Sequence, residues 1–476
     1  MVISTSQKSS WFKQSVQRFV TGLLWLEPIW VISLMPSLLL RDFFWDPWVQ
    51  PWLIGSLLLF WPLRLLATRR LAPCTPLNRP IALLLLWSPV ALWASRYPER
   101  SWDALGYLML GIALYSALLN WSLTQRYPWL VVGGLGAIGL VLTATGPALL
   151  ANIPSKLFLF SDDIRQSQPV NLFGLGETMN SNVLAGALLL PIPFLAALAL
   201  RWDWSPKPTR RWLPLLLGLG ALLMISTLIL TQSRGAYLAL AIGLIVVVLL
   251  RWPQAWLAMV VPTLAVVAVL AWNGTVLFAQ PLGSAGSITS LSGRAEVWQR
   301  ALYALRDFPL TGIGIGTFDL IIPKLYPYTK MSGANIPHAH NLFLQVGVDL
   351  GLPGLVAYSW LLVSAIRILI GILRSAGEVE QPGRASSGSA RVRHALRKER
   401  KRCAALRWTL AAGGLGAFAS LLIHGLVDAV AWGTKVAFLA WLLLALTALL
   451  ALPPQNLVQP HREDVLTDDN TQGTDS

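Results

Sequence analysis

Residues 212–232 read WLPLLLGLGALLMISTLILTQ and contain no charged side chain. About 20 such residues in a helix cross the hydrocarbon core of a bilayer, so this stretch predicts a transmembrane helix. The pattern extends to the whole chain, because 55% of its 476 residues are hydrophobic and only 12% are charged. Soluble domains carry about 25% charged residues. The composition therefore excludes a soluble enzyme, a disordered chain and a disulfide-rich secreted module.

Twelve apolar runs follow one another along the chain, which predicts an all-α polytopic membrane protein with about 12 transmembrane helices. They cover residues 20–40, 51–67, 81–97, 104–121, 128–150, 180–200, 212–232, 235–251, 254–272, 341–373, 407–430 and 432–452. Residues 1–272 hold nine of these helices, and residues 341–452 hold the last three. Residues 273–340 form a large extracytoplasmic loop between them. The run at 341–373 is too long for one straight span, so we expect an interruption before Gly351.

Lysine and arginine gather in segments between the spans. Cytoplasmic loops of membrane proteins carry an excess of these residues. Three basic loops, at 67–80, 201–211 and 374–406, fall on one side of a twelve-helix arrangement, which predicts that both termini are cytoplasmic. Residues 453–476, with five acids and one arginine, are expected to form a disordered acidic tail. The net charge of +15 lies mostly in such loops, so we expect membrane lipids and no nucleic acid as partners.

The large loop contains a helical signal of its own. Ser292 and Gly293 can cap a helix that begins at Arg294 and ends before Pro309. An apolar stripe at helical spacing runs along this helix, formed by Trp298, Leu302 and Leu305. We expect the helix to lie flat on the membrane surface above the bundle.

His340 and Asn341 stand where this loop enters the tenth span. A neutral imidazole at that position can reach water and a membrane-bound substrate together. It is also a competent general base near pH 7. The alternative is an interfacial histidine that caps a helix.

Two arginines lie on the predicted outer side. Arg234 occupies the short connection between the seventh and eighth spans, and Arg294 projects from the first turn of the loop helix. Free N–H groups and the helix dipole favour anions at such a helix start. A guanidinium adds two parallel hydrogen bonds to a phosphate, so the two arginines suit a pyrophosphate. The alternatives are that Arg234 reaches lipid headgroups and that Arg294 pairs with Glu296 or with headgroups.

Four further polar residues are candidates for a supporting role. Asn180 and Asn182 open the sixth span, where they can bind sugar hydroxyls or cap the helix. His424 and Asp428 lie four residues apart near the outer end of the eleventh span, so we expect them to share a helix face. Ionisable residues in a span are functional candidates. These two form either a proton relay or a hydrogen-bonded pair that fixes the packing.

The sequence predicts neither a metal site nor a nucleotide site. The two cysteines, Cys74 and Cys403, have no metal-site spacing and cannot form a disulfide framework. Gly312, Gly314 and Gly316 look like a phosphate loop, but no strand precedes them and no lysine follows. We interpret them as a tight turn, and we expect no cofactor.

Several of these motifs occur together in a recognisable order. The order is Ser233-Arg234-Gly235, then Gly293-Arg294 with Trp298, then Pro309 before Gly312-Ile313-Gly314, then His340-Asn341 followed after nine residues by Gly351-x-x-Gly354. In this respect the chain resembles the O-antigen ligase and polymerase superfamily over approximately residues 170–430. Members of that superfamily move a glycan from a polyprenyl-pyrophosphate lipid to an acceptor without a nucleotide or a metal.

The resemblance implies a role for each matching residue. Arg234 and Arg294 would hold the pyrophosphate of a polyprenyl-linked glycan donor, and His340 would activate the hydroxyl of a glycan or lipid acceptor. It also implies a location in the bacterial plasma (inner) membrane, with transfer on its outer face.

A narrower resemblance offers a rival function. The chain also looks like a cyanobacterial branch of the superfamily that is commonly described as an inorganic-carbon (bicarbonate) transporter. The segments that carry this resemblance are Asn180-Ser181-Asn182, Thr231–Gly235 and His424–Asp428, together with the abundant tryptophan. Arginines bind bicarbonate as readily as phosphate. Transport would need a polar path through the membrane centre, however, and ionisable residues are few there. A third possibility is a non-catalytic membrane partner.

Overall fold

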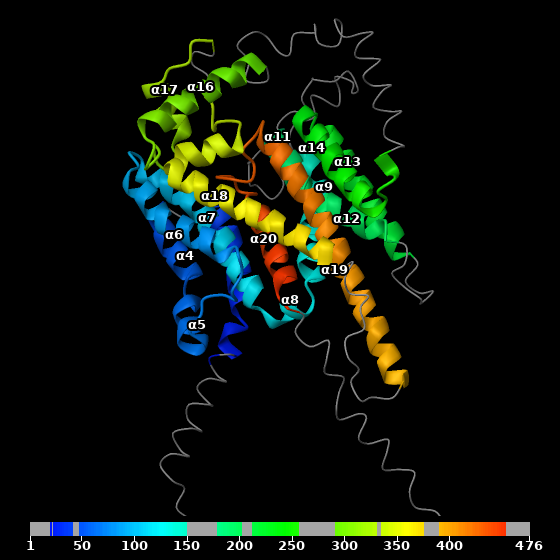
Figure 1. Ribbon diagram of the computed structural model, residues 1–476. Helices are drawn as coiled ribbons and strands as arrows, with labels where there is room; N and C mark the ends of the chain where they lie inside the picture. The colour runs from blue at the N-terminus through cyan, green and yellow to red at the C-terminus, as the bar shows by residue number, and fades with distance from the viewer. Residues whose placement is uncertain are drawn as a thin grey trace, which may run out of the picture.

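The computed structural model describes residues 20, 22–40, 47–149, 179–201, 212–256, 291–330, 335–375 and 390–453, and this part of the chain is almost entirely helical (Figure 1). Its helices are α2 (Glu27–Leu39), η1 (Pro47–Val49), α4 (Gln50–Leu57), α5 (Phe60–Thr68), α6 (Asn78–Trp93), α7 (Pro98–Asn120), α8 (Ser122–Arg126), α9 (Trp129–Leu149), α11 (Ser181–Leu188), α12 (Pro191–Ala199), α13 (Leu213–Leu230), α14 (Arg234–Arg251), α16 (Leu291–Asp307), α17 (Phe318–Leu325), α18 (Leu342–Ser375), α19 (Ala390–Gly425) and α20 (Phe438–Ala451).

The predicted fold class, an all-α polytopic membrane protein, is confirmed. Nine helical segments among the described residues are long and apolar enough to cross a membrane. They are Gly22–Leu39, Gln50–Thr68, Pro98–Asn120, Trp129–Gly146, Ser181–Ala199, Leu213–Leu230, Arg234–Arg251, Leu342–Ser375 and Arg400–Gly425. The predicted spans at 81–97 and 432–452 correspond to α6 and α20, which are shorter, at 16 and 14 residues. The run at 254–272 lies largely outside the described residues, so the count of twelve stays a prediction.

Two groups of helices form the bundle. In the first, α7 is buried along most of its length and packs against α2, α4 and α20. A buried ion pair between Glu27 and Arg64 ties α2 to α5, and Arg64 also donates to the Ser116 hydroxyl of α7 at 3.2 Å. In the second group, α19 packs against α12, α14 and α18.

The helix predicted in the large loop is confirmed as α16, but its buried face is different. Val297, Ala301 and Ala304 are fully buried, whereas Leu302 is 52% exposed. The short side chains let α16 lie close against α18, which the expectation based on large apolar residues missed. Together with α17, α16 forms a small hydrophobic core on the start of α18, which includes Val348 (Figure 1). Its placement flat on a membrane surface stays a prediction.

The predicted interruption of the tenth span is confirmed at Gly351. Its φ of 69° and ψ of −173° break α18 there. The Leu352 amide turns away from the helix and donates to the Pro309 carbonyl at 2.7 Å. A Cβ at Gly351 would lie 2.1 Å from the Leu310 carbonyl oxygen, so only glycine fits. Gly312, Gly314 and Gly316 also have positive φ, as expected for a tight turn, and Gly312 lies against the break at Gly351.

The basic loop predicted at 374–406 is shorter than expected. α19 begins at Ala390, so the second half of that loop is helical, and residues 376–389 lie outside the described residues. Lysine and arginine are good helix formers, so a run of them does not by itself end a helix. The C-terminal end of α19 also differs from the prediction. The helix ends at Gly425, whereas the predicted span continued to residue 430.

Candidate functional site

His340 lies in the segment that leads into α18. It is buried, and its φ of 46° places the backbone in the left-handed region. Its carbonyl accepts a hydrogen bond from Trp298 Nε1 of α16 at 3.2 Å, and its amide donates to His338 Nδ1 at 3.2 Å. These contacts fix the direction of the His340 side chain although the segment is not helical.

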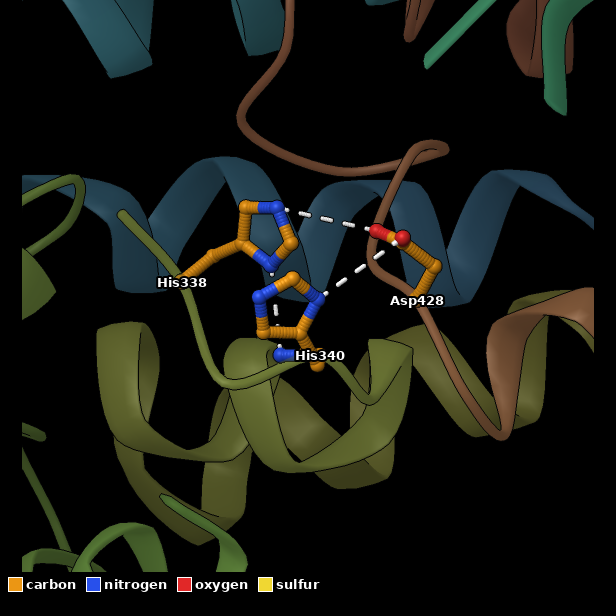
Figure 2. A group of neighbouring side chains, drawn as sticks. All are labelled: His338, His340 and Asp428. Atoms are coloured by element: carbon orange, nitrogen blue, oxygen red, sulfur yellow. Dashed lines mark hydrogen bonds and ion pairs between the residues drawn. The ribbon is translucent and has the colours of Figure 1, made fainter. Parts of the chain in front are cut away.

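His338, His340 and Asp428 form one cluster (Figure 2). His338 Nε2 lies 3.6 Å from one carboxylate oxygen of Asp428, and His340 Nδ1 lies 3.7 Å from the other. The two imidazole rings are 4.2 Å apart. Both nitrogens of His340 and Oδ2 of Asp428 are buried without a hydrogen-bond partner among the described residues. The histidines therefore share one buried carboxylate.

The charges of this cluster are set by its surroundings. Burial favours the neutral acid of Asp428, but the close approach of the His340 imidazole and the attraction of protonated His338, His340 and His424 prevail and hold its pKa well below the usual range. Burial lowers the pKa of His338 to about 4, against the opposing effect of Asp428. At neutral pH, Asp428 is an anion and His338 is neutral. An ionised carboxylate beside an imidazole nitrogen orients the ring and stabilises its protonated form.

Arg294 lies in the first turn of α16, close to this cluster. Burial lowers the pKa of its guanidinium, while the charge of Asp428 raises it. Its Nε is buried without a hydrogen-bond partner among the described residues. Glu296 instead accepts hydrogen bonds from Thr329 and pairs with Arg300. The alternative in which Arg294 pairs with Glu296 is therefore wrong.

Arg234 opens α14 and is exposed. Its neighbour Gly235 packs against the segment that carries Asp428, because a Cβ at Gly235 would lie 2.7 Å from Val427 Cγ2 and 3.9 Å from His424 Cδ2. The structure thus places the start of α14 against the segment that carries Asp428 and leaves the Arg234 side chain exposed.

Two of the three candidate asparagines, Asn341 and Asn180, cap helices. Asn341 Oδ1 accepts the Phe343 and Leu344 amides at 3.0 Å, and its Nδ2 donates to the Leu426 carbonyl at 3.1 Å. Asn341 therefore caps α18 and holds it to the end of α19. Asn180 caps α11 by accepting the Asn182 amide at 2.8 Å. A role of Asn180 and Asn182 in sugar binding stays a prediction.

His424 and Asp428 do not share a helix face as expected. α19 ends at Gly425, so Asp428 lies in the connection to α20. There its carboxylate turns to His338 and His340. His424 lines a small cavity of about 20 Å³ together with Asp428 and Gly186, which is room for about one water molecule.

Two members of the site were not selected from the sequence. His338 is the first, although a His-x-His pair at the edge of a span is itself a signal. Asp349 is the other, an acid in the apolar run just before Gly351, and such acids are functional candidates.

Asp349 is the fully buried centre of a hydrogen-bond network. Its carboxylate accepts Trp432 Nε1 at 2.8 Å and Gln345 Nε2 at 3.0 Å. It also accepts the Gly316 amide at 3.3 Å. Gln345 Oε1 in turn accepts the Ala339 amide at 2.7 Å. The network therefore joins the segment that carries His340 to the connection that carries Asp428.

The cluster also meets the minimum geometry of a metal site. The ligand atoms of His338, His340 and Asp428 all lie within 4.8 Å of one another, and two imidazoles with a carboxylate suit zinc. The nearby guanidinium of Arg294 disfavours a second positive charge in this buried position. The absence of a metal requirement stays a prediction.

Two comparisons with known proteins bear on this site. Residues 219–359 match a family model described as O-antigen ligase, a segment that contains Arg234, Arg294 and His340. The exopolysaccharide production protein ExoQ of Rhizobium meliloti (strain 1021) is 30% identical over 88 residues, which are 18% of this chain and 20% of the relative. The chain thus matches about a fifth of that relative's length. The resemblance to the O-antigen ligase and polymerase superfamily is confirmed, and the narrower bicarbonate-transport branch stays a prediction.

Proposed function

Because this chain shares an O-antigen ligase segment with the ligase and polymerase superfamily, we propose that it transfers a glycan from a polyprenyl-pyrophosphate lipid to an acceptor hydroxyl. The match to an exopolysaccharide production protein supports a membrane ligase or polymerase that acts on polysaccharide. The observation that carries the finer proposal is the pairing of His340 with Asp428 beside the half-buried Arg294.

His340 acts as the general base in this proposal. It takes the proton from the acceptor hydroxyl while the oxygen attacks the anomeric carbon of the donor sugar. The bond between that carbon and the pyrophosphate oxygen breaks, and the pyrophosphate lipid leaves with the negative charge. Asp428 stabilises the imidazolium that forms on His340.

The two arginines stabilise the leaving group. Arg294 stands at the start of α16, where the free amides of the first turn add to its charge. Arg234 approaches from the start of α14 and, being exposed, is free to meet a lipid-borne pyrophosphate. Donors aimed at developing charge in a partly dry site are a large source of catalysis.

The proposal places this site at the outer face of the bacterial plasma membrane. Its support is the distribution of basic residues, because the loops at 67–80 and 201–211 lie on the opposite side of the predicted topology. Both termini are then cytoplasmic. A polyprenyl-linked glycan displayed outside would reach the site from the outer leaflet.

A complementation experiment tests this function. A deletion strain of the source organism receives wild type, His340→Ala or His394→Ala, the last of which changes an exposed histidine of α19. We expect wild type and His394→Ala to restore the length or attachment of the surface polysaccharide on a gel, and His340→Ala to fail at equal protein level.

Other outcomes would favour the alternative functions, which are bicarbonate transport and a non-catalytic role. Polysaccharide that is unchanged by the deletion would contradict glycan transfer, and uptake of radiolabelled bicarbonate would then be measured. A non-catalytic membrane partner would tolerate the loss of Arg234, Arg294 and His340 together.

A further inference from the structure

A second polar site lies far from the histidine cluster along α18. It is a groove of about 870 Å³ between the start of α6, with the residues just before it, and the second half of α18. Its polar lining includes Thr75, Asn78, Arg79, Ser364 and Arg367, and no lining residue is acidic. Arg367 follows the break of α18 at Gly351 by 16 residues (367 − 351), which is about 24 Å of helix. The groove therefore belongs to the opposite end of the membrane domain.

Arg367 needs a partner that the described residues do not supply. It is the one charged residue between Leu352 and Leu373, within a helix long and apolar enough to span a membrane. Its side chain is exposed, and no hydrogen bond or ion pair joins it to another described residue. A charge in a span is costly unless it is paired or reaches the interface. Arg367 stands about 12 Å before the end of α18, which is near headgroup depth.

The opposite wall of the groove is held in place. Thr75 donates to Asn78 Oδ1 at 2.6 Å and also contacts the Tyr115 hydroxyl at 3.2 Å. Asn78 Nδ2 donates to the Pro73 carbonyl at 2.9 Å. Arg79 follows directly and, like Arg367, is exposed without a partner among the described residues.

We propose that this groove binds the phosphate headgroup of an anionic membrane lipid. Arg79 of α6 and Arg367 of α18 line one groove that has no acidic lining residue. Basic pockets between transmembrane helices on the cytoplasmic side of a membrane bind such headgroups. Each guanidinium can make two parallel hydrogen bonds to a phosphate. Trp360 and Ile368 continue the groove along the apolar face of α18. Acyl chains can pack against these side chains, whereas a soluble anion would obtain no binding energy from them. The lining thus favours a lipid over free phosphate.

Thermal unfolding of the purified full-length protein in detergent tests this site. Short-chain phosphatidylglycerol, phosphatidylcholine and inorganic phosphate are each titrated, and the rise in melting temperature gives the half-saturating concentration. We expect phosphatidylglycerol alone to stabilise wild type. Arg367→Gln and Arg79→Gln should each raise its half-saturating concentration by about fivefold, in line with the contribution of one basic residue to binding an anionic lipid.

Arg374→Gln is the matched control, because it removes the same charge from the end of the same helix outside the groove. We expect its half-saturating concentration to match that of wild type. Equal stabilisation by phosphatidylcholine, or equal losses in all three variants, would overturn the proposal. Stabilisation by inorganic phosphate that is lost in Arg367→Gln would overturn the lipid assignment. None of these readouts depends on glycan transfer.

Discussion

Replacing Asp428 with asparagine removes one charge from the histidine cluster and keeps the size of the side chain. The proposed mechanism creates an imidazolium on His340 in the transition state. Its Nδ1 lies 3.7 Å from Asp428 Oδ2, and Asp428 is 2% exposed. Two unit charges at this separation attract by about 4 kcal/mol at an effective dielectric constant of about 20.

This energy sets the size of the expected effect. Since 1.36 kcal/mol corresponds to tenfold in rate, about 4 kcal/mol corresponds to about 10³-fold. We therefore expect Asp428→Asn to lower kcat by about 10²- to 10³-fold, because solvent and nearby dipoles recover part of the lost interaction. Binding of the donor should change less, since the imidazolium is absent from the ground state.

The assay is transfer of labelled glycan from a lipid-linked donor by membranes that contain equal amounts of protein. Asp319→Asn is the matched control, because it removes a carboxylate from an ion pair with Arg100, whose side chain is 56% exposed. Such a pair contributes at most about 1 kcal/mol to stability, and the control should keep wild-type activity. Near-normal transfer by Asp428→Asn, in a background where His340→Ala is inactive, would refute the action of Asp428 through His340.

Four further outcomes are expected. Arg294→Lys should lose most of the transfer activity with the protein still folded, because an ammonium cannot make the two parallel hydrogen bonds of a guanidinium; retained activity would contradict a bidentate phosphate contact. Asp349→Asn should destabilise the fold by about 2 kcal/mol and lower transfer with it, since the amide NH2 would face either the Trp432 donor or the Gly316 and Gln345 donors; an unchanged melting temperature would show that the network is dispensable. Glu27→Gln should cost about 3–5 kcal/mol of stability by leaving a buried cation unpaired, and thermal unfolding in detergent measures it. Transfer should persist in a chelator, and a loss that zinc restores would instead assign the cluster as a metal site.

The sequence was sufficient to predict the fold class and most spans, because a transmembrane helix requires a long apolar run that is visible in the sequence. The predictions were wrong where the packing of a side chain or the length of a helix depends on something other than an apolar run. The buried face of α16 consists of Val297, Ala301 and Ala304, whose small size matters only once α18 lies against them. The start of α19 was missed because its first turns are basic and leave no apolar signal.

In the candidate site, too, some features could be predicted from the sequence and others could not. His340 and Arg234 were selected because each stands at the edge of a predicted span, and Arg294 because it opens the predicted loop helix. Their order also follows a known pattern, and their roles stay predictions. The partner of Asp428 was mistaken, since the expectation considered only neighbours four residues apart on a helix. The contact with His340 joins residues 88 positions apart (428 − 340) and depends on where α19 ends.

The order in which the site residues are synthesised has a consequence for biogenesis. Arg234, Arg294 and His340 leave the ribosome before α19, and Asp428 follows only after that helix. A nascent chain that has inserted α18 already carries the proposed base and both arginines, but it lacks the carboxylate that orients the base. Under the proposed mechanism, a chain interrupted before residue 428 transfers glycan much more slowly than the finished protein. The full rate of transfer is reached only after α19 and the connection that carries Asp428 have been synthesised.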